Sequence, residues 1–169
     1  MNIILFGFRG CGKSYLGKLL SEKIMRPFID TDELIVQLHA QETGETLTVR
    51  AIYRSLGSAY FRSLETKAIQ SLANVEKSVI ALGGGAVLDP QNREMLNKIG
   101  KLVYVEASLD VIKNRGTLPL ENSLEELYLQ SLPIYRSIEA FCVKDLDEKK
   151  AIADICKNLG VHMGVHHGI

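Results

Sequence analysis

The sequence is poor in the features that mark secreted, metal-bound or membrane proteins. Its 169 residues include only three cysteines, which stand far apart at Cys11, Cys142 and Cys156, so neither a disulfide framework nor a zinc site is expected. The 20 basic and 20 acidic residues cancel, so no net positive field favours a nucleic-acid or membrane partner. No apolar run reaches transmembrane length, and the apolar start is too short for a signal peptide. We therefore expect a cytoplasmic protein.

Internal repeats, linkers and low-complexity stretches are also absent from the sequence, which favours one domain. Hydrophobic residues make up 46% of the chain and charged residues 24%, as in ordinary globular proteins. We assign residues 1–159 to this domain and expect residues 160–169 to form a flexible tail. The tail contains His162, His166 and His167. A metal site is one interpretation of these histidines, and a frayed terminus is the favoured one.

A glycine-rich motif follows the first apolar run of the chain. Gly7–Ser14 reads G-F-R-G-C-G-K-S, the pattern of a phosphate-binding loop, and it lies between an expected strand and a helical pattern. The glycines let backbone N–H groups turn toward a polyphosphate at a helix N-terminus. Lys13 is expected to reach the β- and γ-phosphates during catalysis, and the Ser14 hydroxyl to ligate Mg²⁺. The alternative is a turn that only joins strand to helix, and the flanking elements favour the phosphate site.

The loop defines the expected nucleotide-binding residues. They are Gly10, Cys11, Gly12, Lys13, Ser14 and Tyr15. Cys11 is interpreted as a small residue of the loop with no chemistry of its own.

Five apolar runs predict strands, and helical patterns separate them. The runs are Ile3–Phe6, Phe28–Ile29, Ser78–Leu82, Leu102–Val105 and Phe141–Val143. This alternation predicts an α/β fold in which helices cover both faces of a parallel sheet. Two helix starts are marked by capping residues, at Asp89-Pro90 and at Ser123.

Two carboxylates, Asp30 and Asp32, follow the second expected strand. In parallel α/β sheets, ligands bind at the edge where the strands have their carboxyl ends. One carboxylate can hold Mg²⁺ through water, while the other accepts or orients the proton of an attacking hydroxyl. The alternative is that Asp32 only caps a helix over Glu33–Leu38. The phosphate loop one strand earlier favours the functional interpretation.

Three consecutive glycines, Gly83, Gly84 and Gly85, follow the third expected strand. They let a ligand approach the backbone or permit a positive φ. A nucleotide kinase usually carries an acid at this strand end. The triplet instead predicts an exposed nest of N–H groups that faces a polar substrate.

Two arginines are further candidates. Arg62 and Glu65 share a face of a helix expected over Ser58–Ala73. They form either an exposed ion pair of little energetic value or a site where Arg62 clamps a carboxylate or phosphate. Arg115 precedes a segment, residues 116–122, that we expect to form a lid. It is expected to stack on adenine or face the phosphates, and the alternative is a favourable charge at a helix C-terminus.

Taken together, these residues resemble the shikimate kinase family over residues 1 to about 159. The phosphate loop is common to many kinases, whereas the Asp-Thr-Asp, Phe-Arg and triple-glycine elements at these spacings are far more specific. Pro133-Ile134-Tyr135-Arg136 matches the family as well. The resemblance implies a nucleoside-monophosphate-kinase-like fold with a five-stranded parallel sheet. It also implies ATP- and Mg²⁺-dependent phosphorylation of the 3-hydroxyl of shikimate. We expect a monomer that acts on this small molecule.

The resemblance also implies roles by position. Asp30 matches the Mg²⁺-associated acid, and Asp32 matches the residue that contacts the attacking hydroxyl. Arg62 matches a carboxylate-binding arginine, and Arg115 the arginine that packs on adenine. Gly83, Gly84 and Gly85 match the glycines of the substrate pocket.

Two positions depart from the family pattern. Leu118 stands where the lid usually carries an arginine before Pro-Leu, and the lid is several residues short. Ser131 stands where a second carboxylate-binding arginine is usual. Losing a phosphate-facing cation costs on the order of a thousandfold in rate if nothing replaces it. Arg136 and Arg115 are the candidate replacements.

These departures leave two alternatives to an active shikimate kinase. The chain is then either a kinase for another small polyol or sugar acid, or a catalytically impaired nucleotide-binding relative.

Overall fold

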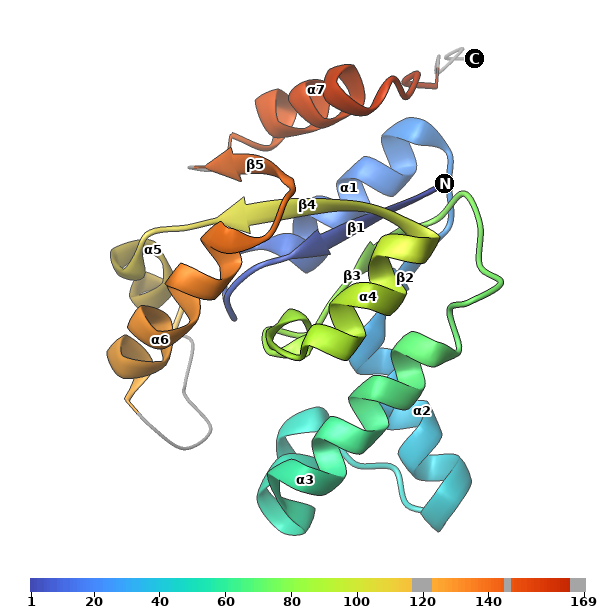
Figure 1. The fold of residues 1–169 in the computed structure, drawn as a ribbon, viewed down its shortest axis with the longest axis vertical. Coiled ribbons are helices and arrows are strands. Elements are labelled where there is room, and N and C mark those ends of the chain that lie inside the picture. Colours follow the sequence, from blue (N-terminus) through green and yellow to red (C-terminus); the bar gives the residue numbers. More distant parts are fainter. Residues whose placement is uncertain (117–122, 145–146, 165–169) are drawn as a thin grey trace.

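The computed structural model describes residues 1–116, 123–144 and 147–164 (Figure 1). Five parallel strands form one sheet in the order β2-β3-β1-β4-β5. The strands are β1 (Asn2–Phe6), β2 (Phe28–Asp30), β3 (Val79–Ala81), β4 (Gly100–Glu106) and β5 (Phe141–Lys144). The predicted α/β fold is confirmed, and each strand lies at one of the five apolar runs.

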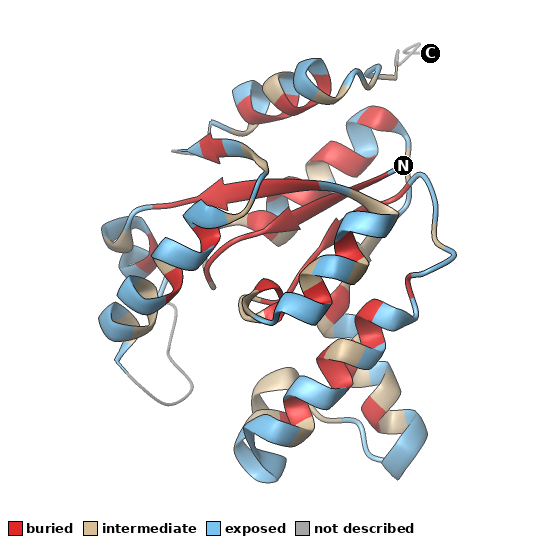
Figure 2. Cartoon of the chain, in the orientation of Figure 1, coloured by how far each residue is buried: buried red, intermediate tan, exposed pale blue. Residues whose placement is uncertain are grey.

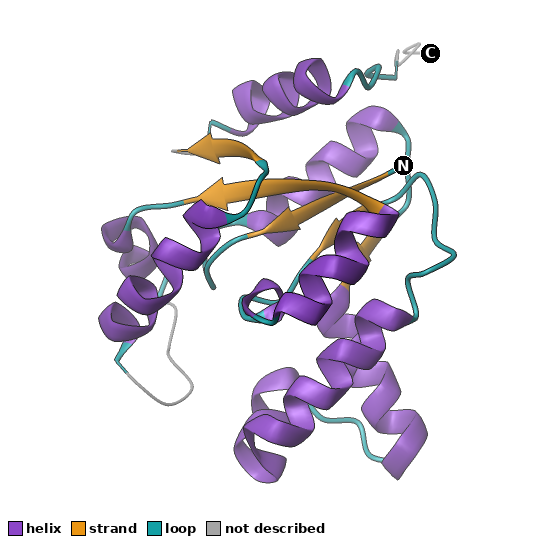
Figure 3. Ribbon diagram, in the orientation of Figure 1, coloured by secondary structure: helices purple, strands orange, loops and turns teal. Residues whose placement is uncertain are grey.

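Helices connect the strands and cover both faces of the sheet (Figure 3). In Figure 1, α1 lies behind the sheet and α4 in front of it. Among the described residues, no helix is long and apolar enough to cross a bilayer. The helices are α1 (Lys13–Ile24), α2 (Thr31–Thr43), α3 (Val49–Gln70), the 3₁₀ turn η1 (Ala86–Leu88), α4 (Pro90–Ile99), α5 (Leu109–Asn114), α6 (Leu124–Ser137) and α7 (Glu148–Leu159).

The central strands are the most buried part of the chain (Figure 2). Every residue of β1 is buried, because helices cover both faces, and such strands read as continuous apolar runs. The edge strand β2 is only half-buried. A second, smaller cluster of buried side chains lies between α2 and α3, away from the sheet (Figure 1). Its members are Ile35, Ile52, Phe61, Leu64 and Ala68.

Helix starts follow the capping residues, with one correction. Asp89 caps α4 and Ser123 caps α6, each by accepting a hydrogen bond from a first-turn amide. Helix α2, however, begins at Thr31, and its cap is Asp30, whose Oδ1 accepts a hydrogen bond from the Asp32 amide at 2.9 Å. The alternative in which Asp32 caps a helix over residues 33–38 is therefore wrong. The Asp32 side chain is left for another role.

Helix α3 contains a break at Gly57, where φ is 84° and ψ is 171°. A positive φ suits glycine because it has no Cβ. The expected helix over residues 58–73 corresponds to the part of α3 after this break, which ends at Gln70.

The lid and tail expectations fall largely outside the described residues. Of the segment 116–122, only Gly116 is described, so the expectation at Leu118 lies outside the described part. Of the tail, residues 160–164 are described, and His166 and His167 are not. The described part leaves α7 at Gly160 and returns to α1, where the Gly164 amide donates to the Lys23 carbonyl at 2.7 Å.

Asn2 joins three segments at the start of the sheet. Its side chain is fully buried. Nδ2 donates to the Val75 carbonyl at 2.6 Å and to the Ile99 carbonyl at 2.9 Å. Oδ1 accepts from the Ser78 amide at 2.9 Å. One amide group thus satisfies backbone groups before β3 and at the end of α4.

Replacing Asn2 with alanine should leave these backbone groups without their partner. Because a buried polar group without a partner costs about 1–3 kcal/mol, we expect Asn2→Ala to lower the free energy of unfolding by about 3 kcal/mol or more. Urea unfolding followed by circular dichroism measures this change. Asn97→Ala, at an exposed position of α4, is the control and should change it by less than about 0.5 kcal/mol. Small, equal changes in both variants would contradict the prediction.

Candidate active site

The glycine-rich loop lies between the end of β1 and the start of α1. Gly10 and Gly12 have φ values of 78° and 95°, in the left-handed region that glycine adopts without strain. Gly12 is the residue before α1, and no side chain caps this helix. The amides of the first turn of α1 therefore lack a side-chain acceptor, which makes the helix N-terminus suitable for an anion.

Within the loop, Lys13 and Cys11 have different surroundings. Lys13 is the first residue of α1 and is 92% buried, with its Nζ 3.4 Å from the Phe8 carbonyl oxygen. Cys11 is buried in the main core, and its amide donates to the same carbonyl at 3.1 Å. Cys11 is not among the residues that line the two cavities at the loop, which agrees with its interpretation as a small packing residue.

The two aspartates after β2 differ in their surroundings. Asp30 accepts a hydrogen bond from the Ser14 hydroxyl at 2.9 Å through Oδ2, while its Oδ1 caps α2. Asp32 faces a cavity and is near Lys13 and Arg9. Burial first, and then the charge of Asp30, raise the pKa of the Asp32 carboxyl above its ordinary value, while Lys13 and Arg9 oppose that shift.

Two cavities meet at the loop. The first has a volume of about 470 Å³ and the second about 500 Å³. Gly10, Lys13 and Ser14 line both of them. The first is further lined by Arg9, Asp32, Val49, Arg50, Phe61, Arg62, Glu65, Gly83, Gly84, Gly85 and Gly116. The second is further lined by Gly12, Tyr15, Arg115 and Glu148.

Arg115 and Tyr15 thus lie together at the second cavity, with Arg115 at the end of α5 as expected. Arg115 Nη1 donates to the Gly10 carbonyl at 2.9 Å, which holds the guanidinium against the phosphate loop. Tyr15 is 60% exposed, and its neighbour across the cavity from α7 is Glu148.

The three glycines after β3 make room for two side chains and for the backbone of the phosphate loop. A Cβ on Gly83 would come within 2.9 Å of Asp32 Oδ1, and a Cβ on Gly84 within 3.2 Å of the Arg9 amide nitrogen. A Cβ on Gly85 would overlap the Arg62 guanidinium. None of the three has a positive φ, so close approach, and not left-handed backbone, is why glycine is needed. The Gly83 amide donates to Thr31 Oγ1 at 3.0 Å, so it is already engaged within the expected nest.

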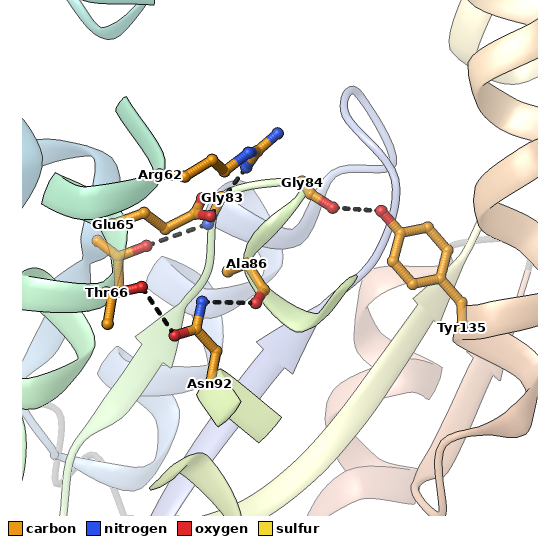
Figure 4. Close-up of polar contacts among 9 residues, drawn as sticks. Arg62, Glu65, Thr66, Gly83, Gly84, Ala86, Asn92 and Tyr135 are labelled. Carbon is orange, nitrogen blue, oxygen red and sulfur yellow. Dashed lines mark hydrogen bonds and ion pairs between the residues drawn. The ribbon is translucent and has the colours of Figure 1, made fainter. Parts of the chain in front are cut away.

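In the Arg62–Glu65 ion pair only the arginine is exposed. Arg62 Nη1 donates to Glu65 Oε1 at 2.8 Å, and the Glu65 side chain is 98% buried (Figure 4). Burial raises the pKa of the Glu65 carboxyl, and the adjacent Arg62 opposes this shift. Among the described residues, Glu65 Oε2 is the one buried side-chain oxygen or nitrogen without a hydrogen-bond partner. It is an acceptor at the cavity wall beside Gly83.

Hydrogen bonds from two sides hold the glycine segment in place (Figure 4). From one side, Thr66 donates to Asn92 Oδ1 at 3.1 Å, and Asn92 Nδ2 donates to the Ala86 carbonyl at 3.0 Å. From the other side, the Tyr135 hydroxyl of α6 donates to the Gly84 carbonyl. The segment is therefore fixed relative to both α3 and α6.

The structure does not bring Arg136 to this cavity. Its Nε donates to Glu106 Oε1 at 2.9 Å, and Lys144 also pairs with Glu106, at 3.2 Å. Arg136 lies one residue beyond Tyr135, so it points to another side of α6. In the structure Arg136 therefore does not line either cavity, as a replacement cation would have to do.

Sequence reasoning missed three charged side chains at the cavities: Arg9, Arg50 and Glu148. Arg9 occupies a variable position of the loop motif, so the motif itself gives no signal for it. Arg50 is in the first turn of α3 and Glu148 in the first turn of α7, positions where charged residues are common on any helix. Burial first, and then the charge of Arg50, lower the pKa of the Arg9 guanidinium, which reflects several cations in one cavity.

Comparison with known proteins identifies the family. The shikimate kinase family model matches residues 9–159 of the chain. This match covers nearly all of the described fold and both cavities.

The chain belongs to the shikimate kinase family.

Individual relatives agree with this assignment. A shikimate kinase from Alkaliphilus oremlandii is 44% identical over 63% of this chain, and the aligned part spans 59% of that protein. A shikimate kinase from Dehalococcoides mccartyi is 32% identical over 94% of this chain and 90% of its own length. Among solved structures, the shikimate kinase from Acinetobacter baumannii in complex with shikimate has a TM-score of 0.80. It is 27% identical and covers 94% of this chain and 92% of that one.

Ionised Asp32 should oppose folding. A raised pKa means that the folded state holds the proton more tightly than the unfolded chain. The destabilisation is therefore absent below the unfolded pKa of about 4 and complete above the folded pKa. We expect Asp32→Asn to raise the Tm at pH 8, by an amount that shrinks as the pH falls toward 4. Thermal unfolding across this range tests it, with the exposed Asp110→Asn as a control that should show no such trend. A lower Tm for Asp32→Asn at pH 8 would contradict the prediction.

Proposed function

We propose that this chain transfers the γ-phosphoryl group of ATP to the 3-hydroxyl of shikimate, giving shikimate 3-phosphate and ADP. The observation that carries the proposal is the pair of cavities that share Gly10, Lys13 and Ser14. Phosphoryl transfer needs donor and acceptor to approach from opposite sides of one phosphate. A wall shared by two cavities, and lined by a buried lysine, is suited to this requirement.

The donor side is the second cavity. The loop backbone and the N-terminus of α1 offer N–H groups to the β- and γ-phosphates. Lys13 adds a positive charge that stays in place while the phosphoryl group moves from donor to acceptor. Gly10, Cys11, Gly12, Lys13, Ser14 and Tyr15 are the proposed nucleotide-binding residues. Arg115, held on the Gly10 carbonyl, is proposed to pack on the adenine base.

The acceptor side is the first cavity. Asp32 is proposed to accept or orient the proton of the attacking hydroxyl, which it can do only when ionised. Its raised pKa makes it a better base than an exposed aspartate. Arg62, held by the buried Glu65, is proposed to bind the substrate carboxylate. The glycine segment at residues 83–85 is proposed to border the ring.

The oxygen ligands at the loop fit a magnesium ion. Mg²⁺ is usually held by one or two protein oxygens together with phosphates and water. The Ser14 hydroxyl and the Asp30 carboxylate, 2.9 Å apart, provide such a pair. When bound, Mg²⁺ would neutralise charge on the phosphates. We further propose a cytoplasmic monomer that has no nucleic-acid or membrane partner.

A coupled assay of ADP release tests the function. Wild type should turn over ATP with shikimate and not with gluconate. Lys13→Ala should lose at least about a hundredfold in kcat because a fixed charge at the phosphates is removed, while its Tm stays near that of wild type. Lys23→Ala, an exposed lysine on the same helix, is the matched control and should keep full activity. Turnover with gluconate alone, or an active Lys13→Ala, would refute the proposal.

The two aspartates should separate kinetically. Asp32→Asn should lower kcat far more than it raises the KM for ATP, since its effect is at the hydroxyl. Asp30→Asn should instead shift the Mg²⁺ dependence of turnover and also loosen the start of α2, which it caps. Steady-state kinetics over a range of Mg²⁺ concentrations measures both effects. Small, equal effects from the two variants would show that neither carboxylate takes part in the reaction.

A further inference from the structure

We propose that Arg9 of the phosphate loop binds the substrate carboxylate together with Arg62, taking the place of the arginine that is missing at Ser131. The inference rests on the proposed function and assigns a specific side chain to it. It makes Arg9 a substrate-binding residue and not a phosphate-binding one.

The first argument is the position of Arg9. It lines the 470 Å³ cavity together with Arg62 and Asp32. It also lines a smaller cavity of about 70 Å³, again with Arg62, and here with Ser131 and Tyr135 of α6. Phe8 of the loop also lines this cavity and packs on Tyr128 of α6, so Arg9 is the charged side chain of the loop that reaches the α6 wall. Arg9 and Ser131 thus line the same small cavity.

The second argument is the way the glycine segment presents both arginines. The backbone of Arg9 lies against Gly84. A Cβ on Gly84 would come within 3.2 Å of the Arg9 amide nitrogen. The Arg62 guanidinium lies against the next residue, Gly85. Because the Tyr135 hydroxyl holds the Gly84 carbonyl, the two arginines are set beside each other by one fixed piece of backbone. Gly84 thus fixes the backbone of Arg9 and Gly85 the guanidinium of Arg62, and both side chains line the same two cavities. Two guanidinium groups brought to one ligand there would match the two oxygens of a carboxylate.

The third argument is charge. Arg9 is half-buried, and Arg50 and Arg62 both act on it as neighbouring positive charges. Placing like charges together in a partly buried cavity is unfavourable, and an anion relieves it. Asp32, on the same cavity, offsets part of this repulsion at Arg9, while Glu65 is already bonded to Arg62. A ligand carboxylate at Arg9 and Arg62 would reduce the remaining repulsion.

Ser131 and Arg9 occupy the space in a complementary way. Ser131 is 92% buried, and its hydroxyl hydrogen-bonds to Tyr135. An arginine at residue 131 would share the cavity of about 70 Å³ that Arg9 lines, so the two cations would lie close together there. The small side chain of Ser131 on α6 thus lies opposite the long side chain of Arg9 in the loop. Arg50 does not line this smaller cavity, so it is the less suitable candidate.

Binding of shikimate and of its methyl ester to Arg9→Met tests the inference. Methionine keeps the length of the side chain and removes the charge. We expect about a tenfold to hundredfold loss of affinity for shikimate, measured by calorimetry. The ester, which has no carboxylate, should bind wild type and Arg9→Met about equally. In turnover, the KM for shikimate should rise while the KM for ATP stays unchanged and kcat falls less than threefold.

Controls separate Arg9 from its neighbours. Arg54→Met, an exposed arginine of α3 that is not among the residues lining either cavity, should behave as wild type. Arg9→Met/Ser131→Arg should regain affinity for shikimate, whereas Ser131→Arg alone should bring no gain because Arg9 already provides the second cation. Thermal unfolding confirms that each variant is folded.

Several outcomes would overturn the inference. If Arg9→Met binds shikimate as wild type does, or loses shikimate and its ester equally, Arg9 does not bind the carboxylate. If Arg9→Met raises the KM for ATP, or lowers kcat without changing the KM for shikimate, Arg9 acts on the phosphate groups of ATP. If Arg50→Met shows the carboxylate-specific loss instead, Arg50 is the second cation. A wild type that fails to bind shikimate would refute both the proposed function and this inference, whereas the preceding outcomes refute only the role of Arg9.

Discussion

One carboxylate, Asp30, connects the parts of the molecule on which the site depends. Through one oxygen it accepts from Ser14 in the first turn of α1, and through the other it caps α2. It therefore couples the phosphate loop to the helix that carries Asp32. Because β1 and β2 run parallel and are separated only by β3, both helices start at the same edge of the sheet. Without this link, the starts of α1 and α2 would be positioned relative to each other mainly through the sheet and the Thr31–Gly83 hydrogen bond.

The elements of the fold were predictable because their signals are local. Strands covered by helices on both faces are continuous apolar runs, and the caps at Asp89 and Ser123 act within one turn. The phosphate loop was equally predictable. The spacing of its glycines is set by the conformation that its own backbone must adopt to turn N–H groups toward a phosphate. The aspartates, Arg62 and the three glycines were candidates from their places in the chain, and the family pattern added their roles. Asp32, Arg62 and the three glycines line one cavity in the structure, and Asp30 lies beside it through its hydrogen bonds to Ser14 and the Asp32 amide.

What sequence could not give was which side chains meet across elements. Arg136 was a candidate by its place in the chain, but one step along a helix turns it toward Glu106. Arg9 was visible in the motif, yet only the approach of the loop to Gly84 and α6 reveals where it extends. Burial of Glu65 was equally hidden, because i,i+3 spacing is the same for an exposed pair and a buried one. Each of these three cases depends on the distance between segments that are far apart in the sequence. The spacing of residues within a helix or strand says only which face of that element a residue occupies.

The break at Gly57 and the separate core between α2 and α3 have a consequence for the energetics of opening. Because this cluster is distinct from the main one, to which Ile69 near the end of α3 belongs, most of the helix pair has its own packing, and we expect it to open locally at a lower free energy than global unfolding. Asp32, Arg62 and Glu65 all belong to that helix pair, whereas Lys13 does not. Amide hydrogens in α2 and α3 should therefore exchange faster than those of β1. A ligand bound between the helix pair and the phosphate loop would slow that exchange. It would thereby couple two parts of unequal stability into one cooperative unit.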